Sequence, residues 1–250
     1  MDTKLRLKSV KLLQNRADLK NIKEGKQLIC CLNAYCYVTA RKDSAYAEAL
    51  NGCDVLLPDG ASVIAACRFL KNPNAPSQRC PGWDLFEQGM IHMQHKAETE
   101  GRKKVMFVGS SEKTQSLIWE QAAQDYPDLE VVTLSPPYVK DFSEEQSREI
   151  IEAINAANPD LLWIGMTAPK QEKWTYQHWN ELNIHCHCGC IGAVFDFYAG
   201  TVKRAPLWWQ RHGLEWLHRL ISEPRRMWRR YLVGNTKFLW YMLGEKFSRQ

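Results

Sequence analysis

The sequence lacks any apolar run long enough to cross a membrane. No uninterrupted apolar stretch among the 250 residues approaches the roughly 20 residues of a transmembrane helix. The first residues, MDTKLRLKSVKLLQ, are basic but contain neither the apolar centre nor the small-residue cleavage site of a secretory signal peptide. We therefore expect neither a membrane-spanning nor a secreted protein, and we expect the chain to be cytoplasmic.

A glycine-rich dinucleotide-binding fingerprint is also missing. The stretch VGSSEKT, residues 108–114, has a single glycine after its apolar segment, whereas the fingerprint requires three. The chain contains no internal repeat and no low-complexity segment. These absences argue against a repeat architecture and a dinucleotide site, and we expect no cofactor.

Paired metal-binding cysteines are absent, although the chain has nine cysteines. Only the stretch HCHCGC resembles a metal-binding cluster. On a strand, Cys186, Cys188 and Cys190 would face one side of the sheet, and His185 and His187 would face the other. No C-x-x-C pair exists elsewhere to complete a tetrahedral site. We predict a buried strand with reduced cysteines, and no metal.

Most of the chain alternates between apolar strand-like segments and amphipathic helical segments. Near-continuous apolar strands are typical of a parallel sheet that helices cover on both faces. The pattern predicts an α/β fold, a Rossmann-like, doubly wound and mostly parallel sheet, over about residues 20–200. The predicted strands are Gln27–Leu32, Cys53–Leu57, Lys104–Val108, Leu129–Leu134, Leu161–Gly165 and Ile184–Ile191. The predicted helices cover residues 41–50, 60–70, 83–98, 111–125, 143–157 (with Ser143 and Gln146 as a capping box) and 170–182.

Positive charge is concentrated at the C-terminus. Residues 203–250 contain eleven Lys and Arg against three Asp and Glu, a net charge of +8, while the whole chain carries +5. Five of the ten tryptophans lie in the same stretch. We predict a catalytic α/β domain over residues 1–202 and a basic, amphipathic helical appendage over residues 203–250. Such an appendage could dock on an anionic membrane, bind nucleic acid, or pack on the body with its arginines in water.

Polar residues gather where the predicted strands end, which is where open α/β sheets bind their ligands. Asp59 lies in LLPDGAS and is either a helix N-cap or a general base for an incoming hydroxyl. Lys170 and Gln171 open a helix that could bind phosphate, or are simply a polar first turn. Arg79 precedes a proline–glycine turn and either reaches a phosphate or caps a surface loop.

Together, these stretches resemble the WecG/TagA/CpsF glycosyltransferase family. The resemblance is carried by LLPDGASV (56–63), the set from Arg79 to Leu85, PKQEKW (169–174), and above all the long block FDFYAGTVKRAPLWWQRHGLEWLHRLISEPRRMWRRYL (195–232). It implies an inverting, metal-independent enzyme that moves a sugar from a UDP-sugar to a polyprenyl-diphosphate-linked sugar. It also implies a peripheral location on the inner face of the cytoplasmic membrane, in surface polysaccharide synthesis.

The resemblance also implies roles for individual residues. Asp59 would be the general base, Asn33 a pocket residue, and Arg79 a phosphate contact, while Gln171 and Asp196 would contact the nucleotide sugar. The appendage arginines would close over the diphosphate. The predicted substrate-binding set comprises Asn33, Arg79, Gly109, Gly165, Lys170, Gln171, Asp196, Arg219, Arg226 and Arg229.

Departures from the family pattern surround the predicted donor pocket, namely Cys31, Trp83, Thr167 and the stretch CIGAVFD (190–196), which is bulkier than the family's glycine-rich version. They leave the donated sugar open among hexoses, hexuronic acids and N-acetylhexosamines. The enzyme interpretation includes no nucleic-acid partner and leaves a homo-oligomer open. The alternatives are a nucleic-acid-binding protein, and a non-catalytic nucleotide-sugar-binding regulator that uses the basic tail to dock a partner.

Overall fold

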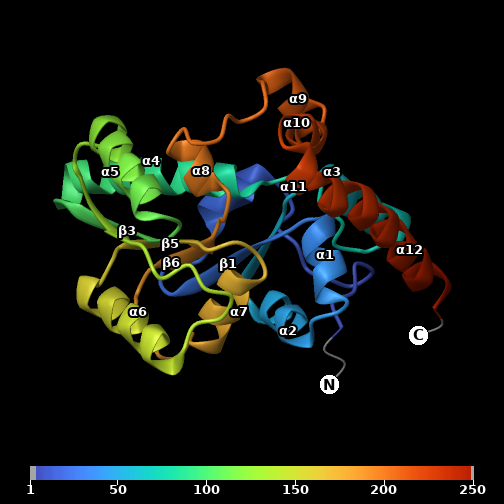
Figure 1. The fold of residues 1–250 in the computed structure, drawn as a ribbon, viewed down its shortest axis with the longest axis horizontal. Coiled ribbons are helices and arrows are strands. Elements are labelled where there is room, and N and C mark those ends of the chain that lie inside the picture. Colours follow the sequence, from blue (N-terminus) through green and yellow to red (C-terminus); the bar gives the residue numbers. More distant parts are fainter. Residues whose placement is uncertain (1–3, 249–250) are drawn as a thin grey trace.

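Six parallel strands form one open sheet between two layers of helices (Figure 1). The computed structural model describes residues 4–248, without the side chain of Arg226. The strand order is β2-β1-β6-β5-β3-β4, and every neighbouring pair is parallel, which confirms the predicted fold class. The strands are β1 (Gln27–Leu32), β2 (Val55–Pro58), β3 (Lys103–Gly109), β4 (Leu129–Leu134), β5 (Leu161–Gly165) and β6 (His187–Cys190).

Helices cover both faces of the sheet, and further helices follow at the C-terminus (Figure 1). The first part of the chain contributes η1 (Arg16–Asn21), α1 (Ala34–Ala40), α2 (Ser44–Gly52), α3 (Ala61–Phe69), α4 (Gly82–Glu100), α5 (Glu112–Asp125), α6 (Glu144–Ala157), α7 (Lys170–Gln177) and α8 (Val194–Tyr198). The C-terminal segment contributes α9 (Leu207–Arg211), α10 (Glu215–Ser222), α11 (Pro224–Trp228), the π turn η2 (Arg229–Val233) and α12 (Gly234–Phe247).

Successive strand residues point into two separate cores, as the period of a β-strand requires. In β5, Leu162 and Ile164 join the cluster beneath α1, α2, α6 and α7. Leu161 and Trp163 join the cluster beneath α4, α5 and α8. Because both faces are buried, the strands read as continuous apolar runs in the sequence.

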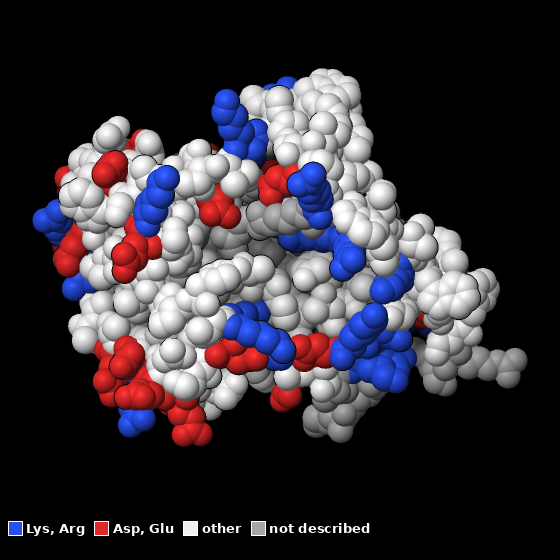
Figure 2. Space-filling view, in the orientation of Figure 1, with Lys and Arg blue, Asp and Glu red and all other residues white. Residues whose placement is uncertain are grey.

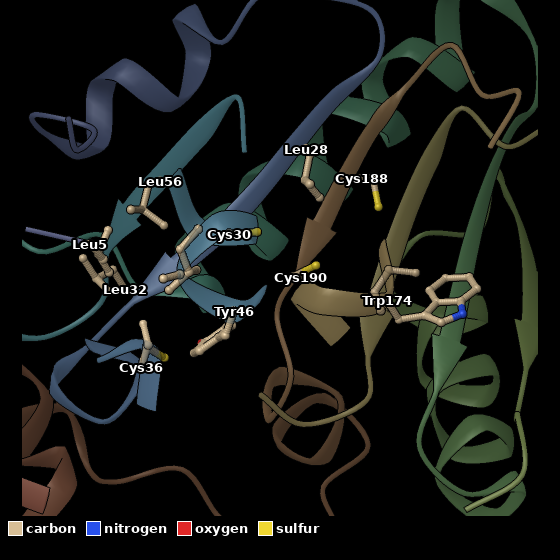
Figure 3. Packing of buried hydrophobic residues seen from close by; sticks show 14 of the residues in the cluster. Leu5, Leu28, Cys30, Leu32, Cys36, Tyr46, Leu56, Trp174, Cys188 and Cys190 are labelled. Atoms are coloured by element: carbon tan, nitrogen blue, oxygen red, sulfur yellow. The ribbon is translucent and has the colours of Figure 1, made fainter. Parts of the chain in front are cut away.

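The cysteines of the HCHCGC stretch behave as small apolar residues. Cys186, Cys188 and Cys190 are all buried on one face of the sheet, while His185 is exposed. Figure 3 shows Cys188 and Cys190 among apolar side chains that include Leu28 of the neighbouring strand. The predicted alternation along the strand is confirmed. Within residues 4–248, no cluster of three or more His, Cys, Asp or Glu side chains could hold a metal ion.

The C-terminal segment packs against the body through α12. Phe238 is 3% exposed and meets the ring of Tyr37 of α1 edge-on, at 5.5 Å between centroids. The carboxylate of Glu245 accepts hydrogen bonds from the Tyr37 hydroxyl and from the backbone N–H groups of Leu7 and Lys8. The last helix is therefore joined both to α1 and to the N-terminal segment. The boundary at residues 202 and 203 stays a prediction.

Most element boundaries agree with the sequence prediction, and the exceptions have local causes. The strands Leu129–Leu134 and Leu161–Gly165, and the capping box of Ser143 and Gln146, are confirmed. The last predicted strand is shorter and starts at His187, and α7 ends at Gln177. The helix α1 was missed, because AYCYVTA is rich in aromatic and β-branched residues that favour strands.

None of the helices in the described part of the chain is both long enough and apolar enough to cross a lipid bilayer.

Candidate functional site

The candidate site lies at the carboxyl edge of the sheet, where β1 and β6 are neighbours. The helix that follows β1 packs into one core, and the helix that follows β6 packs into the other. Neighbouring strands whose connections leave on opposite faces open a crevice at their carboxyl ends. Figure 2 shows the centre of this face hollowed, with many Lys and Arg side chains along the wall formed by the C-terminal segment.

Asn33 and Asp59 join the ends of the first two strands. The side-chain oxygen of Asn33 accepts from the Cys36 N–H at 3.0 Å and so caps α1. Its amide nitrogen donates to Asp59 Oδ2 at 3.3 Å. Asp59 is not a helix N-cap, because α3 starts after Gly60 and has no side-chain cap. The N-cap interpretation of Asp59 is therefore wrong. The general-base interpretation stays a prediction, and the half-buried carboxylate lies at the cleft.

The surroundings of Asp59 make it a stronger base than an exposed aspartate. Burial, first, raises its pKa above the ordinary range. The hydrogen bond from Asn33 opposes this shift, Glu215 adds to it, and the positive charges of Arg79 and Arg230 oppose it. With its pKa raised, the carboxylate accepts a proton more readily than a free aspartate does.

Arg79 connects the body to the C-terminal segment. Its guanidinium donates to the Gln210 carbonyl, and its Nη1 lies 3.7 Å from Glu215 Oε2. The other oxygen of Glu215 lies 3.4 Å from Arg204 Nε. Arg204 also lies over the ring of Trp83, 4.8 Å from its centroid. One carboxylate thus holds two arginines next to the carboxylate of Asp59.

Arg230, in the RRMWRR stretch, is close enough to Asp59 for its positive charge to lower the pKa of that carboxyl. Its guanidinium lies over the Tyr35 ring at 4.4 Å, and its Nε is buried with no hydrogen-bond partner in the described structure. Arg229 is exposed and lies over Trp228 instead. The π turn from Arg229 to Val233 inserts a residue into the helical repeat, so a 3.6-residue spacing does not show which arginine points inward.

The other predicted appendage residues have mixed placements. Arg219 reaches α8, where its guanidinium lies 5.4 Å from the centre of the Phe197 ring. Asp196 lies on the same short helix and is half-buried. The side chain of Arg226 lies outside the described residues. Arg219 therefore reaches the helix that carries Asp196, and the contacts of Asp196 and Arg226 with a ligand stay predictions.

Gln171 and Glu172 form a buried polar pair at the start of α7. Gln171 is 3% and Glu172 1% exposed. Gln171 accepts from the Met166 N–H at 3.2 Å and donates to Glu172 Oε1 at 2.8 Å. Burial raises the pKa of Glu172 to about 7. The pair fixes the loop after β5, and a direct ligand contact of Gln171 stays a prediction.

The remaining predicted residues are explained by packing. A Cβ on Gly109 would lie 2.5 Å from the Gly165 carbonyl oxygen, and one on Gly165 would meet the Phe195 ring. Lys170 points away from Asp59, because its ammonium donates to the Val139 carbonyl at 2.6 Å. The structure brings Asn33, Asp59 and Arg79 together. The sequence prediction missed Arg204, Glu215 and Arg230, and the only signal for them was the density of charge in the tail.

Comparison with known proteins adds a family and named relatives. The model of the "Glycosyl transferase WecG/TagA/CpsF family" matches residues 4–250. A protein of Bacillus spizizenii (strain ATCC 23059 / NRRL B-14472 / W23) is 32% identical over 77% of this chain and 70% of its own length. One of Bacillus subtilis (strain 168) is 29% identical over 89% and 81%. One of Staphylococcus aureus (strain MRSA252) is 27% identical over 76% and 70%. All three are named N-acetylglucosaminyldiphosphoundecaprenol N-acetyl-beta-D-mannosaminyltransferase.

The buried carboxyl of Glu172 gives a pH-dependent stability. Its pKa in the folded chain is about 7 against an ordinary 4.5, so the folded protein loses stability as the pH rises between these values. Glu172→Gln keeps the acceptor for Gln171 and removes the titration. Relative to the wild type, we expect the variant to gain about 3 kcal/mol in unfolding free energy between about pH 4 and about pH 8.

Urea unfolding at both pH values measures this gain. Glu120→Gln, on the exposed side of α5, is the matched control and should show no such dependence. An equal effect of Glu172→Gln at both pH values would contradict the assignment.

Proposed function

The chain belongs to the WecG/TagA/CpsF family of glycosyl transferases, and on this premise we propose that it moves a sugar from a UDP-sugar to a sugar carried on a polyprenyl diphosphate. The names of the relatives specify an N-acetylmannosaminyl group and an N-acetylglucosaminyl-diphosphoundecaprenol acceptor. Of the donor classes that the sequence leaves open, these names support the N-acetylhexosamine class. The family match favours an enzyme over a nucleic-acid-binding protein or a non-catalytic regulator.

The observation that carries the proposal is the Asp59 carboxylate, held by Asn33 at the cleft and raised in pKa by burial. Asp59 takes the proton of the acceptor hydroxyl as its oxygen attacks the anomeric carbon of the donor. The bond between that carbon and the UDP oxygen breaks, and UDP leaves with the electron pair. Attack from the face opposite UDP inverts the anomeric centre. One base of this kind suits a single displacement.

Arginines stabilise the leaving group in this proposal. Negative charge builds up on the UDP diphosphate as the glycosidic bond breaks, and nearby guanidinium groups neutralise it in bidentate geometry. Arg79 and Arg230 act on the charge of Asp59, and Arg204 joins them through its ion pair with Glu215. Glu215 keeps Arg79 and Arg204 together. We therefore propose a reaction that needs no metal ion.

The C-terminal segment supports a peripheral position on an anionic membrane, on its cytoplasmic side. Apolar side chains of α12 face outward, and Trp240 and Phe247 are 74% and 80% exposed. The same helix carries the basic residues Lys237 and Lys246. A helix with this composition lies in the headgroup region and is attracted by anionic lipids. The polyprenyl acceptor would be met at the same surface.

Asp59→Asn should abolish most of the transfer and leave donor binding nearly intact. The amide keeps the shape of the side chain but does not accept the proton, so we expect kcat/KM to fall by about a hundredfold to ten-thousandfold. UDP release from UDP-N-acetylmannosamine, with a short-chain polyprenyl-diphosphate N-acetylglucosamine as acceptor, measures the rate. Calorimetry with UDP measures binding. Asp128→Asn, far from the cleft at the amino edge of the sheet, is the control. Undiminished turnover by Asp59→Asn would reject the base.

The acid limb of the pH–rate profile should report the environment of Asp59. The base works ionised and its pKa is raised, so kcat/KM should fall at a pH above the ordinary aspartate value of about 3.9. Asn33→Asp keeps a cap for α1 but replaces the donor with a like charge, which raises the pKa of Asp59 further. We expect the acid limb of this variant at higher pH. An acid limb at the same pH as in the wild type would show that Asn33 does not interact with the titrating group.

Turnover should survive the removal of divalent ions. Because arginines neutralise the leaving group in this proposal, a chelator such as EDTA should leave the rate of UDP release unchanged. Loss of activity on chelation, restored by added Mg²⁺ or Mn²⁺, would contradict a metal-independent reaction.

A further inference from the structure

A second basic hollow lies beside the cleft, between α3 and the turn from α9 to α10. Its volume is about 300 Å³. Four basic side chains line it, and no acidic side chain is among its lining residues. The basic residues are Arg68, Arg79, Arg211 and His212.

The guanidinium groups in this hollow keep hydrogen-bonding capacity to spare. Arg211 is exposed and has no hydrogen-bond or ion-pair partner in the part of the chain that the structure describes. Arg68 uses only Nη2, which donates to the carbonyls of Pro76 at 3.2 Å and Ser77 at 2.8 Å. These bonds hold the loop that leads to Arg79. Guanidinium groups with unused N–H donors suit the oxygens of a phosphate.

The opposite wall of the hollow is apolar. Ala61, Ile64 and Ala65 lie on one side of α3, at helical spacing. Gly213 brings the α9–α10 turn against this helix, since its φ is +69° and a Cβ there would lie 3.3 Å from the Cβ of Ala61. Leu207, which precedes Arg211 by about one turn of α9, is 66% exposed. The hollow therefore combines cations with an apolar surface that continues outward.

The hollow lies about one sugar ring from the proposed base. Asp59 and Ala61 are two residues apart, so their Cα atoms are separated by at most about 7.6 Å. Arg79 lines the hollow and also faces Asp59. An acceptor sugar with its hydroxyl at Asp59 can therefore extend its anomeric end towards the hollow.

We propose that this hollow binds the diphosphate of the lipid acceptor, with the first isoprene units against α3. This inference rests on the proposed function, in which two diphosphates must be held at once. Arg204 and Arg230 serve the diphosphate of the donor, and Arg68 and Arg211 serve that of the acceptor. Arg79 lies between the two groups.

Farnesyl diphosphate is the direct probe, because it carries the diphosphate and the first isoprene units without any sugar. Calorimetry on the full-length protein should show that Arg211→Gln and Arg68→Gln each weaken its binding by about tenfold, while UDP binding stays unchanged. Ala65→Glu places a carboxylate on the exposed side of α3 and should abolish binding without harming the helix. Arg102→Gln, an exposed arginine at the amino edge of the sheet, is the control. Activity assays should show a raised acceptor KM and an unchanged donor KM.

Several results would overturn the inference. The inference fails if the wild type does not bind farnesyl diphosphate, or if all variants bind it equally. Equal affinities for inorganic pyrophosphate and farnesyl diphosphate would show that the apolar wall contributes nothing to binding. Binding to phosphatidylglycerol vesicles that requires Arg211, and that farnesyl diphosphate does not compete away, would assign the hollow to a phospholipid headgroup. If farnesyl diphosphate binds as expected but no sugar is transferred, the proposed function fails and the prenyl-diphosphate site stands.

Discussion

The side chain of Asn33 makes two hydrogen bonds on which the candidate site depends. Its oxygen caps α1, and its nitrogen holds the carboxylate of Asp59. One residue thus fixes both the helix that leaves β1 and the acid that leaves β2. The two strands are themselves neighbours, with Leu32 opposite Pro58. The register of the sheet therefore determines where the carboxylate lies, and the amide determines how it is oriented.

The charges around this carboxylate come from both sides of the boundary between body and C-terminal segment. Arg79 comes from the loop before α4, Glu215 and Arg204 from the C-terminal segment, and Arg230 from the π turn. Buried and half-buried charges are stable only with partners of opposite sign. The C-terminal segment is for this reason part of the electrostatics of the cleft, and its role is not limited to meeting a membrane.

The sequence was sufficient to predict the architecture and the three residues at the centre of the site. The strands are continuous apolar runs because both faces are covered, and polar residues at their ends identify the ligand edge. The prediction of Asn33, Asp59 and Arg79 follows from those positions and from the family resemblance. The contact between Asn33 and Asp59 could not be predicted, since it depends on the register of two strands 26 residues apart in sequence.

The tail was harder to predict, because its geometry departs from regular helical spacing. A single π turn changes which of two adjacent arginines points inward. The ion pairs of Glu215 join residues from separate loops, and no local pattern in the sequence indicates them. The helix α1 was missed because its composition favours strands, and the cap at Asn33 outweighs that preference.

The carboxylate of Glu245 connects α12 to α1, the helix that begins at the candidate site. It holds the hydroxyl of Tyr37, which lies one helical turn from Asn33 on α1. It also accepts hydrogen bonds from the backbone of Leu7 and Lys8, so α12 joins the N-terminal segment to the same short helix. A fusion partner or a truncation at either terminus would therefore act on the helix that begins at the site, although both termini are remote from Asp59 in sequence.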